Sequence, residues 1–356
     1  MYRTAWLGLL VILILLPLLG SCGVMLAGCD GEEKENAVLN VYNWEDYFAP
    51  TILEDFSQQY GVKVNLETYQ DEEEMLAAVQ SNPDNYDVIF PSDELAVRMI
   101  RMKLLASLNH QNIPNLQNED PEFLDLSYDP GNNYTVPYTW DVTGIAVNTK
   151  YVTETVDSWG ILWDARYQGR IAMINNLYSV IGLTLKYLGY SLSSQDAGEL
   201  EQARLKLLEQ KPLIVGYLDP ATYIDKLVSG ELWLAMAYNG DAITAAEDNP
   251  DIKVIIPKEG ADFWIDCVAI PRDSPHKKTA ELFLNFLLRP EVQADISNYL
   301  GYATPNKAAI DAGLIAPDDL NNPAIYPPRD RLESYRYAGA SDWLYQYIWA
   351  ELRRPS

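Results

Sequence analysis

The residues Asp262-Phe263-Trp264-Ile265-Asp266, followed by Cys267-Val268-Ala269-Ile270-Pro271, change from polar and aromatic to apolar. This change is typical of a strand that enters a buried sheet. Side chains two residues apart on a strand point to the same face of the sheet, so Trp264 and Asp266 lie on the same face. An indole beside a carboxylate suits an organic ammonium group, because the ring offers cation–π attraction and the carboxylate a charge-assisted hydrogen bond. The alternative is a core tryptophan beside an aspartate that caps a turn.

The composition limits both the size and the partners of the protein. A chain of 356 residues with 48% hydrophobic content is large enough for two domains, each with its own core. The formal net charge of -25 argues against nucleic acid and anionic lipid surfaces, and favours cationic small molecules. The 24 tyrosines and 9 tryptophans outnumber the 7 phenylalanines, as is common on ligand-binding surfaces.

The cysteines and histidines provide no pattern for a metal or for catalysis. The 3 cysteines (Cys22, Cys29 and Cys267) match no disulfide framework or zinc spacing, and the 2 histidines lie far from other candidate ligands. Cys267 lies in an apolar strand, and we expect its side chain to be packed in the core without a chemical role. We therefore expect no metal, no cofactor and no enzymatic activity.

The N-terminus is typical of an exported protein. Arg3 precedes the apolar run 5–20, which is shorter than a usual membrane span. Leu26-Ala27-Gly28-Cys29 follows and resembles the lipobox of bacterial lipoproteins, with Leu19-Gly20-Ser21-Cys22 as a weaker candidate. We predict a signal peptide over residues 1–28, lipidation of Cys29 and a flexible tether over residues 29–38. An uncleaved signal anchor is the alternative.

Two α/β units follow the tether. Strand-like and helix-like segments alternate over residues 38–90, which predicts a parallel sheet with helices on its faces. The long β-rich run 136–148 then leads to a second alternation over residues 170–257. We expect two β-type crossings, near Asp141 and Trp264, between lobe 1 (residues 39–141 plus 265–310) and lobe 2 (residues 142–264 plus 311–356).

Two predicted strand ends carry candidate ligand contacts, since ligands bind at the carboxyl ends of parallel strands. The first end presents Trp44 and Tyr47 on either side of the acids Glu45 and Asp46. If they do not contact a ligand, the two aromatic residues are ordinary surface residues of a loop. The second end presents Ser92, which fits either a ligand contact or a plain helix N-cap.

Several blocks in order resemble the polyamine-binding proteins of bacterial ABC importers, a branch of the type II periplasmic binding proteins. The resemblance runs from about Leu39 to the end of the chain. The blocks are Val41–Tyr47, Tyr86–Ser92, Val136–Trp140, Pro257–Gly260, Phe263–Asp266, Asn285–Pro290 and Gly301–Asn306. The resemblance implies a two-lobed α/β fold, each lobe a mainly parallel sheet flanked by helices, that closes over an extended polyamine.

The resemblance also implies roles for individual residues. Trp44, Tyr47, Trp264 and Tyr238 would surround the methylene chain, and Asp266 would be the main acid for an ammonium group. Asp241 and Asp46 match acids of the putrescine-specific branch, while Ser92 and Tyr302 would supply hydroxyl contacts. The implied ligand-binding set is Trp44, Asp46, Tyr47, Ser92, Glu94, Asn176, Ser179, Tyr238, Asp241, Trp264, Asp266, Tyr302 and Tyr335.

This sequence departs from the family pattern at one end of the implied site. Asn176 and Ser179 are neutral where the family carries acids that hold a terminal ammonium group. Glu94 and Glu45 replace a tyrosine and a small polar residue, and Tyr335 replaces a glutamine of some members. Glu94 or Glu45 would restore the negative charge from the other lobe.

Two other functions are compatible with the residues. An exported glycosidase would use acids such as Asp241 and Asp266 with aromatic platforms. The same fold could also bind another cation or a sugar. The expected partners remain a polyamine, the permease subunits of an ABC importer and the membrane through a lipid anchor. We expect a monomer at the cell surface or in the periplasm.

Overall fold

The fold is given by a computed structural model that describes residues 38–334 and 339–354. The strands are β1 (Val38–Trp44), β2 (Lys63–Tyr69), β3 (Val88–Ile89), β4 (Thr135–Asn148), β5 (Ile171–Ile174), β6 (Ile214–Leu218), β7 (Leu234–Tyr238), β8 (Ile252–Ile255), β9 (Ala261–Ala269) and β10 (Leu332–Ser334). The helices are α1 (Ile52–Tyr60), α2 (Glu72–Ser81), α3 (Asp93–Arg101), α4 (Leu177–Tyr187), α5 (Ala197–Gln210), α6 (Pro220–Ser229), α7 (Asn239–Asp248), α8 (Lys277–Leu287), α9 (Pro290–Leu300), α10 (Lys307–Asp311), α11 (Pro317–Leu320) and α12 (Asp342–Leu352).

The strands that the structure describes join in one mixed sheet, in the order β2-β1-β3-β9-β4-β7-β5-β6. The pairs at its two ends are parallel, as the alternation of strands and helices predicts: β1 pairs with β2 and β3, and β5 pairs with β6 and β7. The central pairs, β3 with β9, β9 with β4 and β4 with β7, are antiparallel. The predicted α/β fold is therefore confirmed, with an antiparallel centre.

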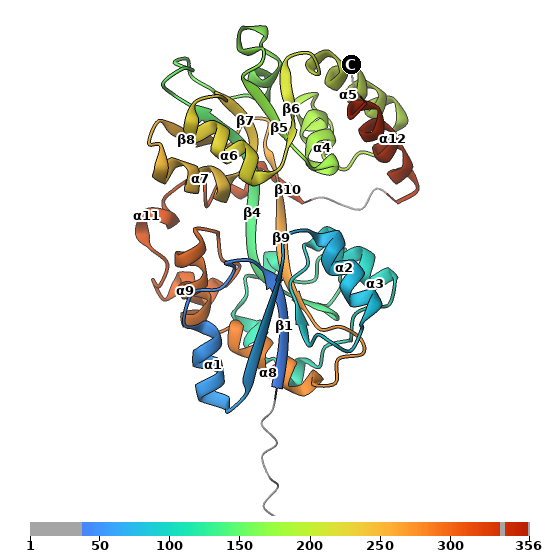
Figure 1. The fold of residues 1–356 in the computed structure, drawn as a ribbon, viewed down its shortest axis with the longest axis vertical. Helices are drawn as coiled ribbons and strands as arrows, with labels where there is room; N and C mark the ends of the chain where they lie inside the picture. Colours follow the sequence, from blue (N-terminus) through green and yellow to red (C-terminus); the bar gives the residue numbers. More distant parts are fainter. Residues whose placement is uncertain (1–37, 335–338, 355–356) are drawn as a thin grey trace, which may run out of the picture. The chain divides into compact units, whose positions relative to one another are not determined.

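The two longest strands, β4 and β9, form the middle of this sheet. Asp141 of β4 pairs with Trp264 of β9, so the two predicted crossings are neighbours. In Figure 1 these strands run between one group of helices that includes α1, α2, α3, α8 and α9 and another that includes α4, α5, α6, α7 and α12. β10 adds to β9 in parallel, and β8 adds to β4.

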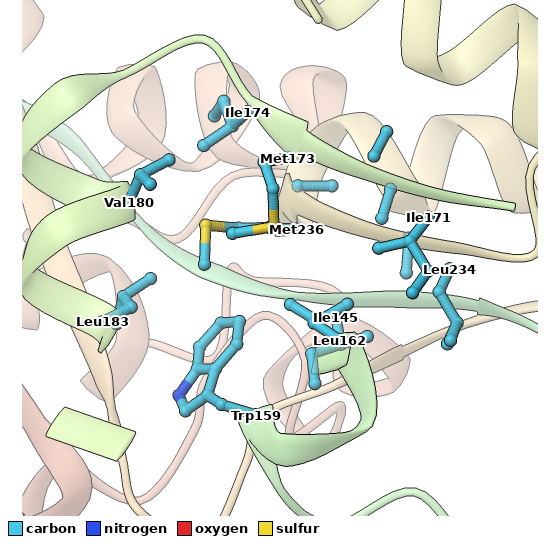
Figure 2. Close-up of a cluster of buried hydrophobic side chains, with 14 of the residues drawn as sticks. Ile145, Trp159, Leu162, Ile171, Met173, Ile174, Val180, Leu183, Leu234 and Met236 are labelled. Carbon is cyan, nitrogen blue, oxygen red and sulfur yellow. The ribbon is translucent and has the colours of Figure 1, made fainter. Parts of the chain in front are cut away.

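Separate hydrophobic cores lie toward the two ends of the sheet. One core gathers buried side chains of β4, β5, β7, α4, α5 and α12 around Trp159, which is fully buried (Figure 2). Another gathers side chains of β1, α1, α8 and α9 around Phe56 and Phe283. These cores hold the strand ends and helix starts that carry the candidate site.

Residues at the helix ends form the capping hydrogen bonds and backbone conformations that their side chains favour. Asp71, Ser92 and Asn176 accept hydrogen bonds from the first-turn amides of α2, α3 and α4. Gly61 ends α1 with φ 68°, a left-handed conformation that glycine adopts without a Cβ penalty. The C-terminal helix α12 begins at Asp342, directly after a short 3-10 helix over Gly339–Ser341.

Candidate functional site

Asp266 of β9 is at the centre of the candidate site. Its carboxylate accepts a hydrogen bond from the Tyr47 hydroxyl, which lies 2.9 Å from the hydroxyl of Thr139 on β4. The side chain is almost fully buried, and this burial raises its pKa to about 7. A cation bound beside this carboxylate would therefore stabilise its ionised form.

Four predicted aromatic residues form a continuous row beside Asp266, named here the aromatic row: Tyr47, Tyr302, Trp264 and Tyr238. The ring centroids lie 5.9 Å apart for Tyr47 and Tyr302, 6.3 Å for Tyr302 and Trp264, and 5.3 Å for Trp264 and Tyr238. The rings meet edge to face, a favourable geometry for aromatic pairs. The Trp264 Nε1 is buried and has no hydrogen-bond partner within residues 38–334 and 339–354.

Two further acids lie near the start of α7: the half-buried Asp241 on the helix and the buried Asp141 on β4. Asp241 accepts a hydrogen bond from the Tyr223 hydroxyl, and burial raises its pKa to about 6. Asp141, which the sequence reasoning did not select, accepts from the backbone amides of Val142 at 2.8 Å and Gly240 at 3.4 Å. Burial, then Asp241 and Asp141, raise the pKa of Tyr302 well above its usual value. Both acids therefore lie close to the aromatic row.

The start of α4 carries the two neutral residues that depart from the family pattern. Asn176 caps the helix, and its Nδ2 donates to the Tyr238 hydroxyl at 3.3 Å. Ser179 donates to the carboxylate of Asp262 at 2.8 Å, and the Thr143 amide donates to the same carboxylate at 3.0 Å.

Asp262 is a buried acid of this region that the sequence reasoning missed. Since it stands two residues before Trp264 on β9, strand alternation places both on one face. The period-two rule that selected Asp266 could therefore have found it.

A cavity of about 930 Å³ lies between α2 and α3 on one side and α4 and α12 on the other. Among the residues predicted for the site, Glu94 is the one that lines it, together with Glu72, Asp93, Tyr178 and Asp342. Burial, followed by the nearby Asp93 and Glu72, raises the pKa of Glu94 well above its usual value. The cavity wall therefore carries several carboxylates together with Arg98, Arg101 and Arg353, of which Arg98 forms an ion pair with Glu73.

The remaining predicted residues are less closely associated with the aromatic row. Trp44 packs on Tyr69, with the two ring centroids 4.6 Å apart. Asp46 is exposed and has a left-handed backbone conformation, with φ 55°. Ser92 is the N-cap of α3, as one interpretation held, and it also forms an isolated β-bridge with Asp266. Cys29 and Tyr335 lie outside the described residues.

No group of three or more histidine, cysteine, aspartate or glutamate residues within 38–334 and 339–354 could hold a metal ion. In that same part of the chain, the helices are too short or too polar to cross a membrane.

The chain is similar to bacterial solute-binding proteins along most of its length. Residues 51–326 match the family model described as bacterial extracellular solute-binding protein. The chain is 32% identical to the spermidine/putrescine-binding periplasmic protein of Escherichia coli K12, and the alignment covers 94% of this chain and 97% of that protein. It is also 32% identical to the putrescine-binding periplasmic protein SpuD of Pseudomonas aeruginosa UCBPP-PA14, covering 89% and 90%.

Solved structures show the same similarity. The spermidine/putrescine ABC transporter substrate-binding protein of Streptococcus pneumoniae is 30% identical with a TM-score of 0.80, covering 89% of this chain and 100% of that one. The Tp0655 lipoprotein of Treponema pallidum is 27% identical with a TM-score of 0.78, covering 89% and 99%.

Proposed function

Since this chain belongs to the family of bacterial extracellular solute-binding proteins, we propose that it captures polyamines such as putrescine and spermidine and delivers them to an ABC importer. Its similarity to spermidine/putrescine-binding and putrescine-binding proteins supports this ligand class. The observation that carries the proposal is the buried Asp266 carboxylate, bonded to Tyr47 and flanked by the aromatic row. The chain binds its solute without catalysing a reaction.

The charges of the site support a ligand with several ammonium groups. Burying an ammonium group is tolerable when it meets a carboxylate, and a buried carboxylate likewise needs a partner. None of the ion pairs among the described residues involves Asp266, Asp241 or Asp262. In the proposal, one ammonium group binds Asp266 and the methylene chain lies along the aromatic row.

The neutral end of the site has other acids close by. Asn176 and Ser179 replace charged residues of the family pattern, but Ser179 is bonded to Asp262, and Glu94 lines the adjacent cavity. We propose that Glu94 and Asp262 supply the negative charge at this end, with Asp241 close to the middle of the ligand. Trp44, Asp46, Ser92 and Tyr335 remain proposed contacts.

The proposed lobes and partners follow from the same family membership. We propose that residues 39–141 plus 265–310 and residues 142–264 plus 311–356 are two lobes that close over the ligand. The separate hydrophobic cores of β1 with α8 and of β5 with α5 support this division. The proposed lipid anchor at Cys29 draws support from the similarity to the Treponema pallidum lipoprotein. The permease of an importer would receive the ligand.

Calorimetric titration of the full-length chain in a nonionic detergent tests the ligand class. We expect binding of at least one of putrescine, spermidine and spermine, and none of maltose. Asp266→Asn should weaken amine binding by about ten- to a hundredfold, since a hydrogen bond to a charged group contributes roughly 1.5–3 kcal/mol. Trp264→Ala should weaken it by about tenfold through loss of a desolvated cation–π contact.

Two matched substitutions on the surface provide controls. Asp311→Asn removes an acid that forms an exposed ion pair with Lys307, and Trp343→Ala removes a tryptophan that is 64% exposed. Both should leave the binding constant unchanged. Maltose binding without amine binding would overturn the ligand class, and unchanged amine affinity in Asp266→Asn would overturn the site.

A further inference from the structure

The Arg329 side chain lies in a cage of three aromatic rings. Its guanidinium carbon is 4.3 Å from the ring centroid of Phe123, 4.8 Å from that of Trp140 and 5.1 Å from that of Phe263. The rings also contact one another, with Phe123 and Trp140 5.4 Å apart. The Nη1 is buried without a hydrogen-bond partner in the part of the chain that the structure describes. The rings therefore provide the main environment of this charge.

The ion pair at the rim of the cage is secondary. Arg329 Nε and Nη2 lie 3.1 and 3.0 Å from the same carboxylate oxygen of Glu122, and the two side chains are 32% and 64% exposed. Exposed pairs of this kind contribute little because water screens them. A planar guanidinium, by contrast, stacks well on aromatic faces and always keeps its charge.

The cage and the aromatic row lie on opposite faces of the paired strands β4 and β9. Phe263 and Trp264 are consecutive on β9, so their side chains point to opposite faces. On β4, Trp140 stands between Thr139, whose hydroxyl meets that of Tyr47, and Asp141. Arg329 thus supports from behind the same two strands that present Trp264 and Asp266 in front.

Trp140 connects the cage to the loop that carries Tyr302. Its backbone amide donates to the Ala303 carbonyl at 3.0 Å, and its Nε1 donates to the Thr304 carbonyl at 3.1 Å. These two residues directly follow Tyr302, a member of the aromatic row. A shift of the Trp140 ring would therefore move the loop and the Tyr302 ring.

We propose that Arg329 is a positioning residue for the ligand site: its guanidinium, held between Phe123, Trp140 and Phe263, fixes Trp140 and through it the loop 302–304. This inference rests on the proposed function for its binding readout. Arg329 would thus affect the affinity for the amine without contacting the amine itself.

The test compares two substitutions of Arg329 in the full-length chain. Arg329→Met keeps a long side chain but removes the charge, whereas Arg329→Lys keeps a cation that can interact with the rings. We expect Arg329→Met to raise the dissociation constant of the best-bound amine by about tenfold, the effect of losing the cation–π contacts with the three rings. Arg329→Lys keeps a cation but lacks the planar stacking of a guanidinium, so we expect it to raise the dissociation constant less than Arg329→Met does. Arg272→Met, at an arginine whose side chain is 53% exposed, is the control and should have no effect.

Hydrogen exchange provides a readout that needs no ligand. Arg329→Met should speed amide exchange in segments 138–142 and 300–306 and leave β5 and β6 unchanged. Unchanged affinity in Arg329→Met, equal losses in the Met and Lys variants, or faster exchange throughout the chain would each overturn the inference. If the unmodified chain binds no amine, the proposed function fails, and the exchange comparison still decides whether Arg329 positions the loop.

Discussion

At the scale of single residues, Asp266 shows a conflict between stability and binding. An aspartate normally ionises near 3.8, whereas burial raises the pKa of Asp266 to about 7 in the folded chain. Folding therefore takes up a proton between these pH values, and the stability of the ligand-free protein falls as the pH rises through this window. A cation at the site would offset this cost, as expected of a carboxylate selected for binding.

Asp266→Asn should accordingly stabilise the ligand-free chain while it weakens amine binding. The asparagine carries no charge to bury and can still accept from the Tyr47 hydroxyl. We expect the free energy of unfolding to rise by about 1–4 kcal/mol at pH 8, since one pKa unit corresponds to about 1.4 kcal/mol. Thermal unfolding from pH 4 to pH 8 measures this gain, which should shrink toward pH 4. A gain that is absent or independent of pH would contradict the argument, and Asp311→Asn serves as the control.

At the scale of elements, the start of α7 and the loop after α9 form one wall of the site. A Cβ placed on Gly240 would lie 1.6 Å from the Tyr302 ring, so the helix and the ring can meet only because this residue is glycine. Tyr238 precedes Gly240 by two residues in the chain, and Asp241 follows it directly. The glycine thus allows Tyr302 to approach both a ring and an acid of the site.

Gly240→Ala should displace the Tyr302 ring and weaken amine binding by about tenfold or more, as expected from the loss of its packing and ring contacts. Gly198→Ala, in the exposed first turn of α5, is the matched control for this change and should leave amine binding unaffected, since its Cβ would meet only the Asp196 side chain. Titration calorimetry and thermal unfolding of both variants provide the comparison. An unchanged dissociation constant in Gly240→Ala would remove Tyr302 from the ligand contacts.

At the scale of the whole molecule, the net charge of -25 affects how ligands arrive. A strongly negative protein attracts small cations over distances comparable to the Debye length, about 10 Å at 0.1 M salt. Contacts inside a buried site are screened much less. Long-range attraction and local binding should therefore respond differently to salt.

We expect the association rate of a polyamine to fall by about tenfold or less between 0.02 and 0.5 M salt, while the dissociation rate changes little. Stopped-flow measurement of tryptophan fluorescence checks this, because Trp264 lies in the proposed site. The uncharged osmolyte sucrose, at matched osmolality, is the control for effects other than screening. A salt effect confined to the dissociation rate would contradict the argument.

Much of the fold follows from patterns that are local in the sequence. The alternation of strand-like and helix-like segments expected over residues 38–90 is confirmed as β1, α1, β2, α2 and β3. Strand alternation also places Trp264 and Asp266 on one face. Such features can be predicted because helix and strand periods act within a few residues of the chain.

The α/β class, the order of the elements and the pairing of aromatic with acidic residues on β9 can all be inferred from the amino-acid sequence. Three other contacts become visible in the folded chain alone: Asp262 with Ser179, Tyr302 with Gly240, and Arg329 with its three rings. These contacts join residues about 60 to 200 positions apart, so they depend on the register of β4 against β9 and on the paths of the connecting loops. No local period carries that information, because it arises when the chain packs.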